Sequence, residues 1–351
     1  MSTRPSAVAV VAVVVLNWNG RDHLRRYLPS VLAHSGDARV VVADNGSTDD
    51  SEAVVRELGA EWLALGRNRG FAGGYNHALA RVEADVYVLL NSDVRVTPGW
   101  LEAPLRRLAE DGRAGAVQPK VLADERPGEF EYAGAAGGFL DDLGYPYCRG
   151  RIFATLEADA GQYDAAVRCD WASGAACFVR AGAWRHVGGF DASYFAHMEE
   201  IDLCWRMRRA GYTVWCEPAS AVYHLGGGTL AYASPRKTFL NFRNSLQTLL
   251  RNGGDAGAVL PRLLARQVLD GMAGLRFLAR GEFASFAAVV RAHLAFYRRA
   301  RGTWAARGVA IAFPGGGTPA VGPRVRSIVA EYYLRGRRRF SELPHRGNAV
   351  R

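Results

Sequence analysis

The stretch ADVYVLLNSDVRV, residues 84–96, decides the fold of this chain. Residues 86–90 are β-branched, aromatic or leucine without polar alternation, which predicts a strand buried on both faces of a mostly parallel sheet. The strand gives way to Asn91-Ser92-Asp93. Because ligands of such sheets bind beyond the carboxyl ends of the strands, Asp93 is a candidate to face a phosphate-bearing substrate and its metal ion. An Asx turn leading to Pro98 would explain the same residues.

Three more strands precede this one, with helices between them. Apolar runs predict strands at residues 8–16, 40–43 and 62–65. Apolar residues at helical spacing follow these strands. They lie in residues 21–33, at Val54, Val55 and Leu58, and in residues 78–82. Strands that alternate with helices indicate βαβ units and an α/β fold.

The polar turns that end these strands should gather along one edge of the sheet, where a nucleotide-sized site is expected. Asp44 can accept hydrogen bonds from a pyrimidine imide or a ribose hydroxyl. Gly70, Gly73 and Gly74 would let the backbone approach a pyrophosphate closely. Their motif, GFAGG, is not the G-x-G-x-x-G of dinucleotide-binding folds, and ordinary turn chemistry is the alternative.

An acidic cluster opens a helix in the second half of the chain. Glu199, Glu200 and Asp202 fall in the first turn of a helix expected to end near Gly211. Acids suit any helix N-terminus, but three together after a loop indicate a site. The helix N-terminus should also favour the ionised carboxylate.

A histidine follows the next apolar segments. Residues 212–216 and 219–223 predict paired strands around Glu217-Pro218, and they end at His224. His224 is a candidate metal ligand, and a hydrogen-bonded structural histidine is the alternative.

Charge divides the chain into two parts. Of 44 Lys+Arg and 34 Asp+Glu, residues 234–351 hold 21 and 5, so the preceding part holds 23 and 29. The body is therefore near −6 and the tail near +16. Basic amphipathic helices expected from residue 237, at 259–280 and at 283–301 suit an anionic bilayer surface, and ordinary packing on the body is the alternative.

Composition excludes several classes of protein. With 351 residues, 49% of them hydrophobic, the chain can bury a large core. No apolar run approaches the roughly 20 residues of a membrane-spanning helix. The five cysteines show no metal-ligand pairs, and free thiols in a reducing cytoplasm are expected. The basic run at residues 335–340 lacks any recognised nucleic-acid reader motif, so no nucleic-acid partner is expected.

Seven ordered blocks resemble those of family 2 glycosyltransferases, and more narrowly the bacterial rhamnosyltransferase-type branch. They are VVVLNWNG (13–20), VVADNGSTDDS (41–51), NRGFAGGYN (68–76), VYVLLNSD (86–93), SGAACFVR (173–180), GGFDASYFAHMEEIDLCWRMRRAGY (188–212) and YHLGGGT (223–229). The resemblance implies a GT-A fold over residues 1–233, with a Rossmann-like nucleotide-binding half at about 8–120 and an acceptor half at about 121–233. Residues 234–351 form a basic, mainly helical extension.

The resemblance also implies roles for individual residues. Asp93 and His224 hold a divalent metal, Mg²⁺ or Mn²⁺, and Glu200 is the general base, with Glu199 and Asp202 as alternatives. The chain departs from the family in two places, because the metal triplet Asn-Ser-Asp has a single acid and the usual aspartate base is a glutamate. The expected nucleotide-sugar contacts are Asn17, Asn19, Asp44, Asn68, Gly70, Gly73, Asn76 and Ser92.

The function implied is metal-dependent, inverting transfer of a sugar from a dTDP- or UDP-linked donor, with rhamnose as the sugar of this branch. The acceptor would be a hydroxyl of a lipid-linked or cell-envelope glycan, at the inner face of the cell membrane. The Gln-x-x-Arg-Trp block of processive synthases is missing, which favours addition of one or a few sugars. One alternative is a sugar nucleotidyltransferase, but such an enzyme would have a glycine-rich turn followed by an arginine after the first strand, and NWNG is not such a turn. The other is a non-catalytic membrane- or nucleic-acid-binding protein on a transferase scaffold.

Overall fold

The computed structural model describes residues 9–226, 234–308 and 325–344. Its strands are β1 (Val11–Asn17), β2 (Arg39–Asp44), β3 (Glu61–Ala64), β4 (Val86–Asn91), β5 (Val94–Val96), β6 (Ala114–Ala123), β7 (Gly138–Leu140), β8 (Pro146–Cys148), β9 (Arg151–Ile152), β10 (Thr155–Leu156), β11 (Val167–Arg168), β12 (Ala176–Arg180) and β13 (Thr213–His224). Its helices are α1 (Arg21–His34), α2 (Ser51–Leu58), α3 (Gly70–Leu79), α4 (Glu102–Glu110), α5 (Ala181–Val187), α6 (Glu199–Arg209), α7 (Pro235–Asn252), α8 (Ala256–Ala279) and α9 (Phe283–Ala305).

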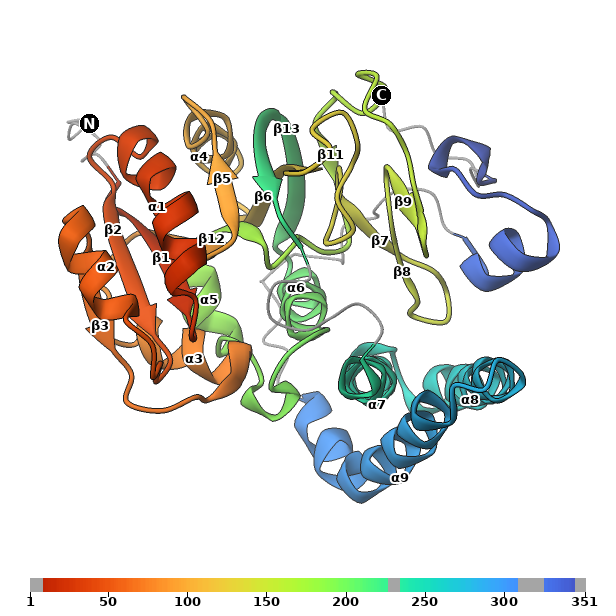
Figure 1. Ribbon diagram of the computed structural model, residues 1–351. Helices are drawn as coiled ribbons and strands as arrows, with labels where there is room; N and C mark the ends of the chain where they lie inside the picture. Colours follow the sequence, from red (N-terminus) through yellow and green to blue (C-terminus); the bar gives the residue numbers. More distant parts are fainter. Residues whose placement is uncertain (1–8, 227–233, 309–324, 345–351) are drawn as a thin grey trace, which may run out of the picture.

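One large sheet forms the centre of an α/β fold, as predicted (Figure 1). Its strand order is β11-β13-β6-β12-β4-β1-β2-β3, with β5 paired to β13. Strands β1 to β4 pair in parallel, and their helices alternate with them along the chain. Residue 8, the first of the predicted opening strand, lies outside the described residues.

Strand β4 confirms the buried strand predicted from residues 86–90. Side chains alternate between two apolar cores, because Tyr87 and Leu89 pack with α3 and α5, while Val88 and Leu90 pack with α1, α2 and α4. The sheet around β4 is not fully parallel. Strand β1 runs parallel to β4, but β12 lies between β4 and β6 and runs antiparallel to both. Helices thus cover both faces, which leaves the ends of the strands as the open edge.

Two predicted elements were wrong. The glycine-rich segment is itself helix α3, which ends at Leu79, whereas a helix was expected at residues 78–82. A Cβ on Gly74 would lie 2.9 Å from Leu16 Cδ1, so glycine lets the helix pack closely on β1, and this tertiary contact overrides low helix propensity. The two strands expected around Glu217-Pro218 are the single strand β13, in which a register shift against β6 accommodates the proline.

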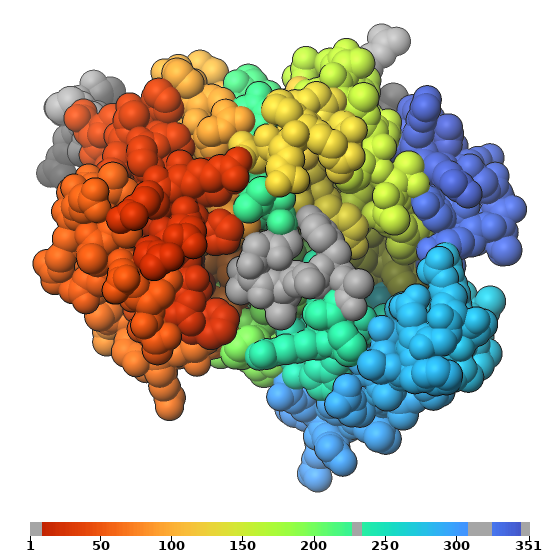
Figure 2. Space-filling view, viewed as in Figure 1, coloured from red at the N-terminus to blue at the C-terminus, as the bar shows by residue number. Residues whose placement is uncertain are grey.

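The irregular segment after β6 contains short strands and loops, as predicted. Strands β7 to β10 form a separate small antiparallel sheet in the order β10-β9-β8-β7. Helices α7, α8 and α9 follow, with α7 between the body and α9, and they form the lower right of the molecule in Figure 2. Each helix in the described segments is too short or too polar to cross a bilayer.

A buried polar network fastens these helices to the body. Arg266 Nε on α8 lies 3.2 Å from Asp270 Oδ1. Arg266 Nη2 donates a hydrogen bond to Ser245 Oγ on α7 at 2.6 Å. The Tyr145 hydroxyl donates to the same Asp270 oxygen at 3.0 Å, and His293 Nε2 on α9 lies 3.3 Å from the other. Asp270 therefore connects the body with α8 and α9.

We expect Asp270→Ala to lower the free energy of unfolding by about 3–5 kcal/mol, because it leaves the buried Arg266 without its counter-charge. Urea unfolding of the full chain measures this. The matched control is Glu52→Ala, which removes an exposed i,i+4 pair with Arg56 on α2 and should cost below about 1 kcal/mol. Equal effects of the two substitutions would show that the network does not stabilise the fold.

Candidate active site

The loops that follow β1 and β2 are cross-linked at the carboxyl edge of the sheet. Asn17 and Asp44 lie side by side in the register of the two strands, and Asn17 Nδ2 donates to Asp44 Oδ1 at 3.2 Å. The backbone amide of Asn19 donates to Ser47 Oγ at 2.8 Å, and Asn19 Oδ1 accepts from the Thr48 amide at 2.7 Å. The structure thus brings together three of the predicted nucleotide contacts, Asn17, Asn19 and Asp44.

The Asp44 carboxylate accepts several hydrogen bonds from within these loops. It accepts from Asn17, from the Ser47 hydroxyl, and from the amides of Gly46 and Ser47 at 3.2 and 3.0 Å. Asn17 Oδ1, by contrast, is buried without a hydrogen-bond partner among the described residues. A Cβ on Gly20 would lie 2.4 Å from this oxygen and 3.4 Å from Ser92 Oγ, which places Ser92 beside it. This edge therefore contains a buried acceptor whose hydrogen-bonding capacity is unused among the described residues.

The glycine segment is used for packing. Gly70 has φ +73°, and a Cβ there would lie 2.5 Å from the carbonyl oxygen of Phe195. That carbonyl accepts from the Phe71 amide at 2.6 Å, so this first-turn amide of α3 already has a partner. Asn68 Oδ1 accepts from the Gly70 amide at 2.8 Å, and Gly73 lies against Arg69 and Ala192. A pyrophosphate contact at Gly70 and Gly73 stays a prediction, and in this structure Phe195 lies directly against Gly70.

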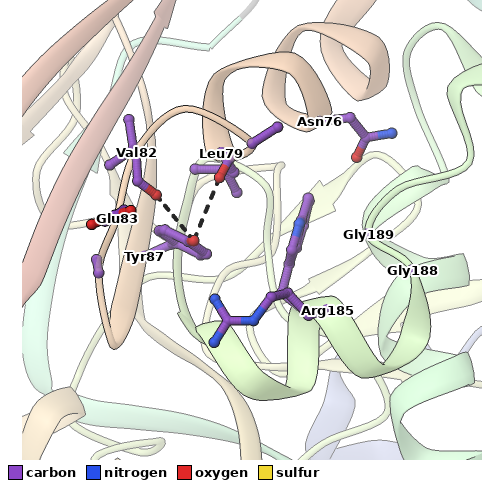
Figure 3. Close-up of a pocket in the computed structure, with 11 residues that line it drawn as sticks. Asn76, Leu79, Val82, Glu83, Tyr87, Arg185, Gly188 and Gly189 are labelled. Atoms are coloured by element: carbon purple, nitrogen blue, oxygen red, sulfur yellow. Dashed lines mark hydrogen bonds between the residues drawn. The ribbon is translucent and has the colours of Figure 1, made fainter.

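Asn76 lies away from the other predicted residues. Its amide donates to the Phe190 carbonyl at 2.8 Å and accepts from the Phe190 amide at 2.9 Å. It also lines a pocket of about 690 Å³ between α3 and α5, shown in Figure 3 with Tyr87. Tyr87 precedes Asn91 by four residues, about 13 Å along β4. This pocket therefore lies toward the amino end of β4, remote from Asp93.

Asp93 and His224 meet at the opposite end of β4. Residue 94 pairs with His224 across β5 and β13, and His224 Nε2 lies 3.2 Å from Asp93 Oδ1. His224 Nδ1 lies 3.1 Å from Glu131 Oε2, and all three side chains are buried. Burial lowers the pKa of His224, but the Asp93 and Glu131 carboxylates outweigh it and raise that pKa to about 10. In return, His224 outweighs the burial of Asp93 and lowers the pKa of that carboxyl.

The donor atoms of this pair fit a divalent cation. Two neighbouring ligands with bonds of about 2.1–2.2 Å at right angles are about 3 Å apart, close to the 3.2 Å between Asp93 Oδ1 and His224 Nε2. A ligating histidine characteristically gives its other ring nitrogen to a carboxylate, the position of Glu131. The described segments contain no group of three or more His, Cys, Asp or Glu arranged to hold a metal alone. Phosphate oxygens and water would have to complete the shell.

Glu131 was missed in the sequence. It lies in the irregular segment between β6 and β7, where no periodic pattern or motif singles it out. It is one of four acids in residues 124–131, and nothing in the sequence distinguishes it from the others.

The three acids at the start of α6 differ in their surroundings. Asp202 is fully buried and binds Arg206 Nε and Asn252 Nδ2, both at 2.8 Å, so it belongs to the packing of α6 on α7. Glu199 and Glu200 each keep a buried Oε2 without a hydrogen-bond partner in the part of the chain that the structure describes. The choice among the three candidates for the base therefore narrows to the two glutamates.

Burial overrides the expected effect of the helix N-terminus on Glu200. It raises the pKa of the Glu200 carboxyl to about 7, while backbone amides of the first turn lower it by less. Burial and the neighbouring Glu200 also raise the pKa of Glu199 well above its usual value. The first turn of the helix does favour the carboxylate, as expected, but the solvation lost on burial has the larger effect. A carboxyl that titrates near neutrality can take or give a proton.

A strained loop precedes these acids. Phe195, His197 and Met198 have φ of +66°, +68° and +73°, a region that costs a non-glycine residue about 1–3 kcal/mol. Asn244 on α7 holds this loop, because its Nδ2 donates to the carbonyls of Tyr194, Ala196 and His197 at 3.1, 2.9 and 2.7 Å. A helix of the C-terminal region thus fixes the approach to Glu199 and Glu200.

The turn before β12 connects the two sides of the site. The Asn91 amide donates to the Ala175 carbonyl at 3.0 Å, and a Cβ on Gly174 would lie 3.9 Å from Glu200 Cβ. Glu200 therefore lies at the same edge of the sheet as Asp93 and His224.

Comparison with known proteins gives the family. The model of glycosyl transferase family 2 matches residues 12–174. The N-acetylglucosaminyl-diphospho-decaprenol L-rhamnosyltransferase of Mycobacterium tuberculosis is 30% identical over 236 residues, which cover 61% of this chain and 76% of that protein.

Solved structures give the fold. The mannosyltransferase PcManGT of Pyrobaculum calidifontis, in complex with GDP-Man and Mn²⁺, is similar with a TM-score of 0.51 at 17% identity, covering 88% of this chain and 87% of that one. GalNAc-T7 with UDP, GalNAc and Mn²⁺ has a TM-score of 0.54 at 15% identity, covering 70% of this chain but only 48% of that one. The α/β architecture thus matches GT-A glycosyltransferases. With its sequence blocks and relatives, the chain is a glycosyltransferase that belongs to glycosyl transferase family 2.

Proposed function

We propose that this protein is a metal-dependent, inverting glycosyltransferase that moves a sugar, rhamnose, from a dTDP- or UDP-linked donor to a hydroxyl of a lipid-linked glycan. The observation that carries the proposal is the pair Asp93–His224 at the same sheet edge as the unsatisfied carboxyl of Glu200. The name of the mycobacterial relative, an L-rhamnosyltransferase of a diphospho-decaprenol sugar, supports rhamnose and a lipid-linked acceptor.

The donor side consists of the loops after β1 and β2 and the end of β4. Asn17 and Ser92 are the proposed nucleotide contacts, and the Asn19–Ser47 bond and the Asp44 carboxylate hold the two loops together. A direct bond from Asp44 to the base stays a prediction. Asp93 and His224 would hold Mg²⁺ or Mn²⁺ against the diphosphate. Such a cation offsets the negative charge that develops on the diphosphate as it leaves.

Glu200 acts on the acceptor. As the acceptor oxygen forms its bond to the anomeric carbon, the hydroxyl proton passes to Glu200. The bond from that carbon to the diphosphate breaks, and its electron pair leaves with the phosphate oxygen. Attack from the face opposite the leaving group inverts the anomeric carbon. A lipid-linked acceptor and the positive tail support placing the enzyme at the inner face of the cell membrane.

We expect Glu200→Gln to lower kcat for sugar transfer by about 100-fold or more, because the amide cannot accept the proton. The matched control is Glu199→Gln. Since this variant keeps the Glu200 carboxyl that accepts the proton, it should retain activity within a few-fold. Transfer from labelled nucleotide sugars measures both. Full activity of Glu200→Gln would exclude Glu200 as the base.

The pH dependence of the wild type tests the same assignment. The active form of Glu200 is the carboxylate, and its pKa is raised to about 7, so kcat should rise with pH up to about 7 and then level. A rate that is flat between pH 5 and 8 would contradict the assignment.

We expect Asp93→Asn to abolish the thermal stabilisation that Mn²⁺ with UDP or dTDP gives the wild type, because the metal loses its carboxylate ligand. A ligand at 100 times its Kd stabilises by about 2.7 kcal/mol, which a melting curve resolves. Asp37→Asn, an exposed aspartate in the turn after α1, is the matched control and should keep the full shift. Unchanged stabilisation of Asp93→Asn would remove Asp93 from the metal site.

We expect Asn244→Ala to lower kcat by about 10-fold or more with little change in donor KM, because the loop that precedes Glu200 loses three hydrogen bonds. Gln247→Ala is the control on the same helix, since Gln247 Nε2 donates to the Ser193 side chain, which lies outside the strained segment. Steady-state kinetics separate the two parameters. If donor KM rises while kcat holds, Asn244 does not position the base.

A further inference from the structure

Helix α8 exposes a continuous apolar stripe. Its residues recur every three or four positions along one side of the helix, and each is 55–66% exposed. We call them the apolar ridge: Leu260, Leu264, Val268, Met272 and Leu275. An isolated exposed leucine is ordinary, but five on one helix face form a patch of the kind that marks an interaction site.

The ridge is not the result of a loosely packed helix. The opposite side of α8 is well buried, with Leu263, Arg266, Asp270 and Gly274 against the body and α9. Its charged members belong to the network that includes Tyr145, Ser245 and His293. Because the inner face is fixed by these contacts, the ridge has to face outward.

The neighbouring helix α9 also exposes apolar side chains. It packs on α8 where Gly274 meets Phe286 and Val289, and it exposes its own apolar stripe. The members of that stripe are Phe283, Val290, Leu294, Tyr297 and Trp304, each 41–68% exposed. Figure 2 shows α8 and α9, in cyan and blue, as one lobe at the side of the molecule.

The charge around the two stripes is almost entirely positive. Residues 256–305 contain eight arginines and two acids. Of the two acids, Asp270 is buried with Arg266, which leaves Glu282 as the exposed one. The arginines that are exposed beside the stripes are Arg276, Arg280, Arg291, Arg298 and Arg301.

We propose that the outer surface of α8 and α9 docks on an anionic lipid bilayer, with the apolar ridge in the interface and the arginines on the headgroups. Apolar side chains flanked by cations on amphipathic helices match this environment, and each cation near the surface contributes about 1 kcal/mol. A second copy of the chain fits less well, because it would bring two positive surfaces together. The inference rests on the proposed function, because docking on a membrane would bring the enzyme to its lipid-linked acceptor.

The test is flotation of the full chain with vesicles of phosphatidylcholine alone or mixed with phosphatidylglycerol. We expect binding to the anionic vesicles only, and a loss of about 10-fold or more in Leu264→Glu/Leu275→Glu. The matched control, Ala53→Glu/Ala109→Glu, adds the same charge at exposed positions of α2 and α4 and should bind like the wild type. Wild type that stays with the lipid-free fraction, or equal loss in both variants, would overturn the proposal. So would a wild-type dimer that the ridge variant converts to a monomer, or duplex DNA that binds to the ridge in place of lipid.

Two further measurements separate this inference from the proposed function. The ridge variant should keep wild-type stabilisation by Mn²⁺ with UDP or dTDP, and wild-type transfer to a short-chain, water-soluble acceptor. Vesicle binding without any sugar transfer by the wild type would reject the proposed function and leave the docking surface intact. Sugar transfer without vesicle binding would do the reverse.

Discussion

The position of the His224 ring, between two buried carboxylates, is the interaction on which the site depends. Its Nε2 faces Asp93 at 3.2 Å and its Nδ1 faces Glu131 at 3.1 Å. Asp93 follows β4, His224 ends β13 and Glu131 lies between β6 and β7, so one ring joins three segments far apart in the sequence. Away from water, two carboxylates strongly favour a positive charge between or beside them. The two carboxylates therefore stabilise positive charge at this edge of the sheet, which is why they raise the pKa of His224 despite its burial.

Much of the fold could be predicted because the decisive segments are short apolar runs with polar ends. The strands that end at Asn17, Asp44 and Asn91 show this pattern, and their order along the chain indicates which edge collects the polar ends. The failures depended on tertiary contacts. Helix α3 forms because Gly74 packs against Leu16, and β13 continues through Pro218 because its register shifts against β6. Local sequence shows neither contact.

Residues of the candidate site could be proposed from the sequence, but their electrostatics could not. Asp93, His224 and Glu200 stand at recognisable positions, but Glu131 has no pattern around it, and Gly70 is already covered by Phe195. The pKa of Glu200 shows the physical reason. A helix N-terminus stabilises a carboxylate by about 0.3–1 kcal/mol. Burial can raise a carboxyl pKa by up to 3–5 units. Burial depends on loops that a sequence pattern does not place.

Adjacent residues of α7 contact both the loop before Glu200 and helix α8. Left-handed conformations at Phe195, His197 and Met198 persist only where surrounding contacts impose them, and Asn244 supplies three of those contacts. The next residue, Ser245, accepts from Arg266 on α8, the helix that carries the apolar ridge. One turn of α7 thus binds the loop before Glu200 on one side and α8 on the other. The C-terminal region therefore helps to fix both the conformation of the loop before Glu200 and the direction in which α8 faces.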